Sequence, residues 1–311
     1  MKIVVTGGCG FIGSHIVDEL VNSGYDVIVI DNKSANNDVF YYNDKAVYFD
    51  CDINDYDRVV SLTTDVDCIF HLAAESRIGP CIENPILATK TNVLGTCNLL
   101  QAAKLNGVSR FIYSSTSSAY GNNNSSPQVE TMNIDCLNPY SVTKVAGEAL
   151  CKMYYDLYKL PTITFRYFNV YGDRQPTKGQ YAPVIGIFLR QLKANQPLTI
   201  VGDGSQRRDF VNVRDIVSAN VLAMNTTDNN CFGKVFNIGS GVNFSVKEIA
   251  DLISINQVYL PAREGEAKET LANIMLANQL LKFEPKHNVA EWILKKVVDE
   301  RIKCGKMIIV R

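Results

Sequence analysis

The stretch KIVVTGGCGFIG at residues 2–13 joins an apolar, β-branched run to a cluster of glycines. The run predicts a buried strand, and the apolar spacing of residues 11–22 predicts a helix directly after the glycines. Gly8, Gly10 and Gly13 match the pattern G-x-G-x-x-G. Glycine suits such a turn because a diphosphate must approach bare backbone N–H groups at a helix N-terminus, where a Cβ atom would block it. The stretch therefore predicts a strand, a turn and a helix that together bind a dinucleotide.

An acidic residue at the end of the next expected strand identifies the dinucleotide more closely. Asp31 ends the strand at residues 26–31 and lies 21 residues after Gly10. A carboxylate at this place accepts hydrogen bonds from the adenosine ribose and repels a 2′-phosphate, so the pattern favours NAD over NADP. A glycine-rich turn beside an unrelated surface aspartate is the alternative, and the combination of strand, turn and acidic residue disfavours it.

The same alternation of apolar runs and helical patterns continues through the first half of the chain. Further strands are expected at residues 46–50, 68–72, 110–114 and 162–167. Helices are expected near residues 55–63, within 84–105 and at 139–159, the last beginning at an N-cap asparagine followed by proline. Continuous apolar strands separated by helices predict a parallel sheet covered on both faces. The expected fold class is α/β, with a Rossmann-type doubly wound parallel sheet.

Beyond residue 168 the alternation loosens, and glycine, proline and polar residues concentrate at 171–183 and 202–208. We expect residues 1–168 to form the NAD-binding domain and residues 169–311 to form mainly a smaller, mixed lobe that binds substrate. Segments around 208–240 are expected to return in part to the first domain.

Composition limits the classes of protein to which the chain can belong. It has 311 residues, 46% hydrophobic and 20% charged, and a net charge of −1, which is typical of a globular protein and gives no reason to expect nucleic acid or an anionic membrane as partner. Nine scattered cysteines without a C-x-x-C pair and three unclustered histidines argue against a metal site and a disulfide framework. No apolar run approaches the roughly 18 residues of a membrane span, and the first strand leaves no room for a signal peptide, so we expect a cytoplasmic protein.

A tyrosine and a lysine on the helix expected at 139–159 suggest the chemistry. Tyr140 and Lys144 are four residues apart and share one helix face. A lysine ammonium beside a phenol stabilises the phenolate and lowers the pKa of the tyrosine, which could then act as a base. The pattern Y-x-x-x-K alone is common by chance. Upstream, however, the hydroxyl-rich residues 114–118 end a strand of the parallel sheet, where doubly wound folds bind ligands.

In this order the motifs resemble the extended short-chain dehydrogenase/reductases, in their NAD-dependent epimerase/dehydratase branch, and within it the UDP-sugar 4-epimerases. The resemblance covers nearly the whole chain and rests also on residues 52–53, 71–74, 92–96 and 166–169. It implies a catalytic Thr116 beside Tyr140 and Lys144. The cofactor contacts that it implies come from Gly7, Gly10, Phe11, Ile12, Gly13, Asp31, Asn32, Asp52, Ile53, Leu72, Ala73, Ala74, Asn92, Ser114, Tyr140, Lys144 and Tyr167.

The resemblance also implies a set of substrate-binding residues, namely Ser76, Thr116, Asn169, Arg208, Arg263, Glu266 and Thr270. Arginine suits the diphosphate because its fork binds two oxygens at once, although a single arginine of this kind is more often a solvated surface charge. Arg208 follows an expected glycine-rich hairpin at 201–204. In the register of the family, Thr270 is the substrate gate. A tyrosine there restricts the pocket to glucose and galactose, whereas a small residue leaves space for a 2-acetamido group.

The expected activity is interconversion of UDP-N-acetylglucosamine and UDP-N-acetylgalactosamine, of UDP-glucose and UDP-galactose, or of both pairs, through a transient 4-keto sugar. The 4,6-dehydratases carry Asp-Glu after the catalytic Thr, where this chain has Ser117 and Ser118, which cannot serve as acid and base for elimination. The alternatives are another NAD-dependent nucleotide-sugar oxidoreductase, a 4,6-dehydratase, or a non-enzymatic NAD-binding scaffold, which the presence of Thr116, Tyr140 and Lys144 disfavours.

Members of this family commonly form homodimers through the helix before the hydroxyl run and the helix that carries the tyrosine. The apolar faces within 84–105 and at 139–159 are compatible with a homodimer here. Two parts of the chain depart from the family. Residues 245–263 form a shorter segment than usual, and residues 298–311 match no known part of it.

Overall fold

The computed structural model describes residues 1–35, 39–122, 124–177, 182–262 and 267–303. Within these residues the main sheet has seven strands, all parallel, in the order β10-β6-β5-β4-β1-β2-β3. They are β1 (Lys2–Thr6), β2 (Asp26–Asp31), β3 (Val47–Asp50), β4 (Cys68–His71), β5 (Arg110–Thr116), β6 (Thr162–Tyr167) and β10 (Lys234–Ile238). The strand order reverses between β1 and β4, and doubly wound sheets bind ligands at such a switch point. The expected fold class is confirmed.

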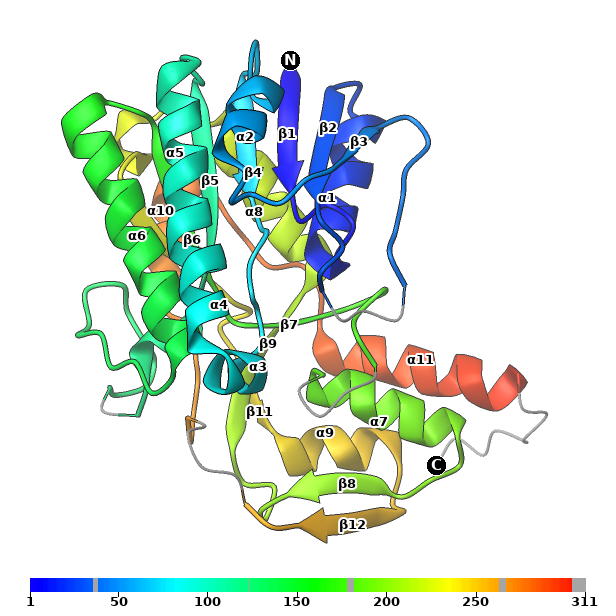
Figure 1. Ribbon diagram of the computed structural model, residues 1–311. Helices are drawn as coiled ribbons and strands as arrows, with labels where there is room; N and C mark the ends of the chain where they lie inside the picture. The colour runs from blue at the N-terminus through cyan, green and yellow to red at the C-terminus, as the bar shows by residue number, and fades with distance from the viewer. Residues whose placement is uncertain (36–38, 123, 178–181, 263–266, 304–311) are drawn as a thin grey trace.

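Helices cover both faces of this sheet (Figure 1), because successive residues of each strand point to opposite sides. On one face, Ile3 and Val5 of β1 pack with α1 (Phe11–Asn22) and α8 (Val213–Asn225). On the other face, Val4 packs with α5 (Gly95–Leu105) and α6 (Pro139–Tyr158), and α2 (Tyr56–Leu62) lies beside α5. Each such fully buried aliphatic side chain contributes about 1.5–3 kcal/mol relative to exposure, which accounts for strands that are apolar throughout.

The helix that carries Tyr140 begins and ends as its local sequence dictates. The side chain of Asn138 accepts a hydrogen bond from the backbone N–H of Ser141, and Pro139 occupies the first helical position, where no N–H is needed. The helix stops at Lys159, whose φ of 60° is left-handed. This start places Tyr140 in the first turn of α6.

The helix expected within residues 84–105 is divided in the structure. It consists of α4 (Pro85–Thr89), a π-helical turn at Lys90–Leu94 and α5, and α3 (Ile78–Glu83) precedes it. Turns of this kind often occur at functional sites because the extra residue redirects a side chain. Here the turn contains the buried Asn92.

The second half of the chain adds a smaller lobe beyond the carboxyl ends of the main strands (Figure 1). The strands β7 (Asn169–Tyr171), β9 (Arg207–Asn212) and β11 (Asn243–Ser245) form one sheet, and β8 (Leu198–Val201) pairs with β12 (Gln257–Leu260). Its apolar core includes residues of α7 (Val184–Lys193), α9 (Val246–Ile253) and α11 (Val289–Lys303). After β9 the chain returns to the main sheet as α8 and β10, and α10 (Met275–Leu281) packs there too.

The prediction of a hairpin at residues 201–204 is wrong. The turn joins β8 and β9, but these strands lie in different sheets, because β9 pairs with β7 and β11 while β8 pairs in parallel with β12. The glycines at 202 and 204 correctly predicted a turn. Which strands pair on either side of it depends on tertiary packing. None of the helices in the described part of the chain combines the length and the apolar character needed to cross a membrane.

Candidate functional site

The glycine turn between β1 and α1 is closely packed at Gly7, Gly8 and Gly13 and less crowded at Gly10. A Cβ atom at Gly13 would lie 2.3 Å from the carbonyl oxygen of Gly7, and Gly7 itself has a φ of +70°. A Cβ atom at Gly10 would meet one neighbour, that same oxygen, at 3.3 Å. Gly10 is the N-cap of α1, and no side chain caps the helix there. The first turn of α1 therefore begins without a side-chain cap, and such a helix N-terminus suits the diphosphate of a dinucleotide.

Asp31 lies beside this turn, at the end of β2. Its carboxylate accepts hydrogen bonds from the backbone N–H of Cys9 at 3.0 Å and of Lys33 at 2.8 Å. Asn32 donates to Asp52 at 3.3 Å, which ties the loops after β2 and β3 together, and the neighbouring Ile53 is buried. Of the expected adenosine-binding residues, Asp31, Asn32 and Asp52 are thus brought to one edge of the sheet.

The loop after β4 is held by hydrogen bonds on both sides. The N–H groups of Leu72 and Ala73 both donate to the hydroxyl oxygen of Thr6 at 3.2 Å. Asn92 accepts from the N–H of Glu75 at 2.8 Å and donates to the hydroxyl of Thr143 at 2.9 Å, so it fixes this loop to α6. Ala74 lies in the same loop, half-buried, and the side chain of Ser76 is exposed.

The expected catalytic residues come together at the end of β5 and the start of α6. The Thr116 side chain lies close enough to the phenol of Tyr140 to lower the pKa of that phenol. Lys144 is one turn further along α6, 3% exposed, with its ammonium nitrogen 4.4 Å from the centre of the Tyr113 ring. The hydroxyl of Thr116 also accepts from the N–H of Ser118 at 3.1 Å, which fixes its orientation.

The electrostatics of this pair require a correction. We expected Lys144 to lower the pKa of Tyr140, but burial raises the pKa of Tyr140 to about 12, and the neighbouring Thr116 side chain opposes that rise. Burial also lowers the pKa of Lys144 to about 8. Both groups are removed from water, so burial disfavours the charged form of each. The chain alone therefore holds a neutral phenol beside a lysine that is still mostly protonated at pH 7.

A second tyrosine lies at the end of β6, next to the Thr116 strand. The Tyr167 hydroxyl accepts from Ser114 at 3.2 Å and from the side-chain amide of Asn220 at 2.7 Å, and it is buried. Ser114 and Tyr167 were expected at the cofactor. Asn220 was not, because one asparagine among the several polar residues of α8 gives no signal in sequence.

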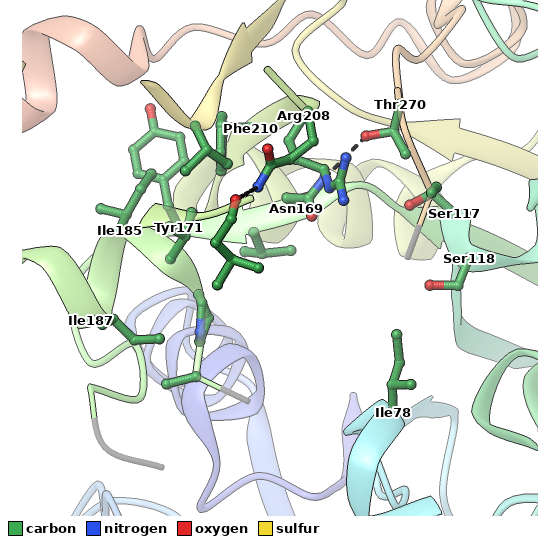
Figure 2. A pocket seen from close by; sticks show the side chains of 18 of the residues that line it. Ile78, Ser117, Ser118, Asn169, Tyr171, Ile185, Ile187, Arg208, Phe210 and Thr270 are labelled. Carbon is green, nitrogen blue, oxygen red and sulfur yellow. Dashed lines mark hydrogen bonds between the residues drawn. The ribbon is translucent and has the colours of Figure 1, made fainter. Parts of the chain in front are cut away.

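A cleft of about 290 Å³ lies between the two lobes. Asn169, Arg208 and Thr270 meet there, and Figure 2 shows Ser117 and Ser118 across the cleft from Ile185 and Ile187. The amide of Asn169 donates to the hydroxyl of Thr270 at 3.3 Å. The guanidinium of Arg208 donates to the carbonyls of Arg207 at 2.9 Å and Lys268 at 3.3 Å.

Some expected substrate residues do not lie in this cleft. Arg263 and Glu266 lie outside the described residues, and Ser76 and Thr116 are not among the residues that line it. The other two expected catalytic residues, Tyr140 and Lys144, do not line it either. Apolar side chains that sequence reasoning did not single out make much of the wall, because in sequence they are indistinguishable from core residues. They include Ile78, Tyr171, Ile185, Ile187, Phe188 and Phe210.

A buried ion pair behind the catalytic residues was also missed. Glu148 lies one turn beyond Lys144 on α6 and accepts from Arg166 of β6 through two bonds, Nε at 2.9 Å and Nη2 at 2.7 Å. Ser115, the neighbour of Thr116, donates to the same carboxylate. The spacing Tyr140, Lys144, Glu148 along one helix face is the signal that could have identified it.

Comparison with known proteins agrees with this geometry. Residues 3–239 match the model of the NAD dependent epimerase/dehydratase family. The UDP-glucose 4-epimerase of Mycolicibacterium smegmatis is 34% identical over 309 residues, which cover 96% of this chain and 97% of that protein.

Two solved structures extend the likeness to three dimensions. The UDP-glucose 4-epimerase of Thermotoga maritima with UDP-glucose superposes with a TM-score of 0.90 at 35% identity, covering 98% of this chain and 100% of the other. The UDP-N-acetylglucosamine 4-epimerase of Methanobrevibacter ruminantium, in complex with UDP-N-acetylmuramic acid, gives 0.88 at 32% identity, covering 97% and 98%. The chain therefore belongs to the NAD-dependent epimerase/dehydratase family, and NAD is its cofactor.

Proposed function

We propose that this protein is a UDP-sugar 4-epimerase, which inverts the configuration at C4 through a transient 4-keto sugar. The observation that carries the proposal is the placement of Tyr140 beside the Thr116 side chain and one turn before the buried Lys144, at the carboxyl edge of the sheet and near a cleft between the lobes. The full-length likeness to 4-epimerases supports it.

In the proposed reaction Tyr140 takes the proton of the sugar 4-hydroxyl and later returns it. The Thr116 side chain lies beside the phenol and would hydrogen-bond the same sugar oxygen, which keeps the proton path short. The glycine turn and Asp31 would hold NAD, which would supply a reversible hydride acceptor for C4 and a positive charge that would favour the phenolate of Tyr140. Lys144, one turn along the helix, is mostly protonated below its pKa of about 8.

The cleft supports epimerisation over dehydration. Elimination of water across C5 and C6 needs a carboxylic acid and a carboxylate. The residues described along the cleft include no aspartate or glutamate, and Ser117 and Ser118 occupy the wall directly after Thr116. A sugar oxidised at C4 in this cleft thus meets no group suited to expel its 6-hydroxyl.

The substrates that we propose are UDP-N-acetylglucosamine and UDP-N-acetylgalactosamine, with UDP-glucose and UDP-galactose as a second or alternative pair. The small side chain of Thr270 at the cleft supports the acetylated sugars, because a larger residue there would occupy space beside Asn169 and Arg208. In this proposal Arg208 binds the diphosphate, and the lobe after residue 168 binds mainly the nucleotide sugar.

The test is to incubate the purified protein with each UDP-sugar separately and to resolve the products chromatographically while following absorbance at 340 nm. We expect the 4-epimer to form without lasting growth of NADH absorbance. Accumulating NADH would indicate an oxidoreductase instead, and a product lighter by one water would indicate a dehydratase. Absence of any product with either sugar would contradict the proposed function.

A further inference from the structure

One buried carboxylate lies at the centre of the proposed substrate residues without lining the cleft. Asp209, in β9 between Arg208 and Phe210, is 0% exposed. Its backbone N–H donates to the hydroxyl of Thr270 at 3.4 Å, and its carbonyl accepts from the side-chain amide of Asn169 at 3.1 Å. The backbone of Asp209 thus contacts two of the three substrate residues that meet in the cleft, and the third is its neighbour in the chain.

The side chain of Asp209 accepts hydrogen bonds from two segments, one at Ser240 and Gly241 and one at Ala272. Its Oδ1 accepts from the N–H and the hydroxyl of Ser240, both at 2.7 Å. Its Oδ2 accepts from the N–H groups of Gly241 and Ala272, both at 3.0 Å. Four donors therefore converge on two oxygens, which matches the capacity of an ionised carboxylate and exceeds that of any neutral side chain of this size.

The segment that carries Thr270 is fixed by this carboxylate on one side. Ala272 follows Thr270 by two residues, and in an extended chain alternate N–H groups point to opposite sides. The N–H groups of Thr270 and Ala272 donate toward β9, to the Arg207 carbonyl at 3.1 Å and to Asp209. The intervening Leu271 donates to the side chain of Gln128 on the other side, at 2.7 Å.

The contact leaves little space for adjustment. A Cβ atom at Gly239, just before Ser240, would lie 2.5 Å from the Cβ of Ala272 and 2.7 Å from Oδ2 of Asp209. Glycine is therefore required there, and the three segments meet without a gap. The position of Thr270 relative to β9 thus follows from the Asp209 carboxylate.

We propose that Asp209 is a positioning residue that sets the depth of the cleft at Thr270 and thereby the discrimination between 2-hydroxyl and 2-acetamido UDP-sugars. This inference rests on the proposed function. Asp209 touches no substrate in this scheme. It acts through Thr270, Asn169 and Arg208.

The test compares Asp209→Asn with a matched control elsewhere in the chain. Asparagine keeps the shape but turns an NH₂ group toward N–H donors, so the Thr270 segment should move away from β9. Asp215 is 2% exposed on α8 and accepts from the N–H groups of Lys286 and His287. Asp215→Asn therefore removes a comparable buried carboxylate that contacts none of the cleft residues discussed above.

The measurements are the dissociation constants of UDP, UDP-glucose and UDP-N-acetylglucosamine by calorimetry, with bound NAD and Tm as controls. For Asp209→Asn we expect the affinity ratio of the two sugars to change about tenfold toward one, while the affinity for UDP changes much less. For Asp215→Asn we expect a lower Tm and an unchanged ratio. Ser240→Ala, which keeps the carboxylate and removes one donor, should give a smaller change in the same direction as Asp209→Asn.

The inference is overturned if Asp209→Asn weakens all three ligands by the same factor, or if both Asp variants alter the ratio alike. A wild-type ratio near one also contradicts it. If Asp209→Asn does not fold, the test rests on Ser240→Ala. An unchanged affinity ratio of the two sugars in Ser240→Ala then rejects the inference. The proposed function is judged separately, because a wild-type protein that binds both sugars and converts neither would refute the activity while the affinity ratios still report on Asp209.

Discussion

The phenol of Tyr140 and the ammonium of Lys144 share one helix face, on which Lys144 is buried and Tyr140 is partly buried, and the pKa of each group is shifted. Burial raises the pKa of the phenol to about 12 and lowers that of the ammonium to about 8. Two neutral neighbours, Thr116 and the ring of Tyr113, contact these groups. The protein therefore positions the two groups and shields them from water. An added positive charge is needed to lower the pKa of Tyr140 enough for it to act as a base.

Tyr140→Phe removes the hydroxyl oxygen and leaves the ring. We expect turnover of either UDP-sugar to fall by orders of magnitude, because the variant lacks the phenol that takes the 4-hydroxyl proton in the proposed mechanism. NAD should remain bound to the purified variant. Product formation by chromatography and NAD content by absorbance check the two parts, and unchanged turnover would refute the mechanism.

Lys144→Met tests the buried ammonium through stability. The pKa of Lys144 falls from 10.5 to about 8 on folding, so between those values the unfolded chain holds a proton that the folded chain has lost. Stability contributed by this group therefore rises with pH across that window and is constant below it. We expect the Tm of the wild type, relative to that of Lys144→Met, to increase between about pH 8 and 10. Parallel Tm curves for the two proteins would contradict the assignment.

At the scale of elements, the site depends on how one turn and one helix meet the sheet. The glycine turn brings the N-terminus of α1 to the switch point between β1 and β4, and α6 is joined to β6 by the Glu148–Arg166 pair. Both connections are short, so a small change in either moves a whole element.

Two glycines of the turn should respond differently to alanine. At Gly10 the added Cβ has one contact, at 3.3 Å, and the φ of −83° is ordinary, so Gly10→Ala should fold normally but lose NAD. At Gly13 the Cβ would lie 2.3 Å from a backbone oxygen, so Gly13→Ala should lower the Tm as well. Circular dichroism melts of the NAD-free proteins and NAD titration separate the two effects. Equal loss of stability in both would contradict this division.

The ion pair between α6 and β6 should behave as a buried one, since Arg166 and Glu148 are 4% and 7% exposed. Glu148→Leu leaves the arginine charge unpaired, and we expect a loss of about 3–5 kcal/mol in the free energy of unfolding. The double variant Glu148→Leu/Arg166→Met should lose much less than the sum of the single variants. Urea unfolding of the three proteins measures this, and additive losses would show that the pair is not coupled.

At the scale of the whole molecule, α5 and α6 lie side by side (Figure 1) and carry exposed apolar side chains, most of them on α6. Those exposed along the two helices are Leu105, Val142, Met153, Leu157 and Tyr158. Helix pairs of this kind form four-helix interfaces when two copies meet. We propose that the protein is a homodimer through this face.

Charges placed in that face should separate the dimer. Met153 and Leu157 are 38% and 63% exposed and lie one turn apart, beyond the catalytic end of α6. We expect Met153→Glu/Leu157→Glu to sediment as a monomer. Ile255→Glu, at a residue 96% exposed in the smaller lobe, should remain a dimer. A wild-type monomer, or a double variant that stays dimeric, would contradict the proposed interface.

The features that sequence alone predicted are those set by neighbours in the chain. The glycine turn is required by backbone sterics within a few residues, and the start of α6 follows from Asn138 and Pro139. The face shared by Tyr140 and Lys144 follows from helical spacing. The alternation of apolar runs with helical patterns is also visible along the chain, and it was enough to predict a parallel sheet with covered faces.

Tertiary structure alone decided the features that depend on partners distant in sequence. The four donors around Asp209 come from residues 31 to 63 positions away, and Asn220 reaches Tyr167 across 53 positions. The separation of β8 from β9 and the raised pKa of Tyr140 arise in the same way. Burial and strand pairing depend on which surfaces come together, and no local pattern of residues contains that information.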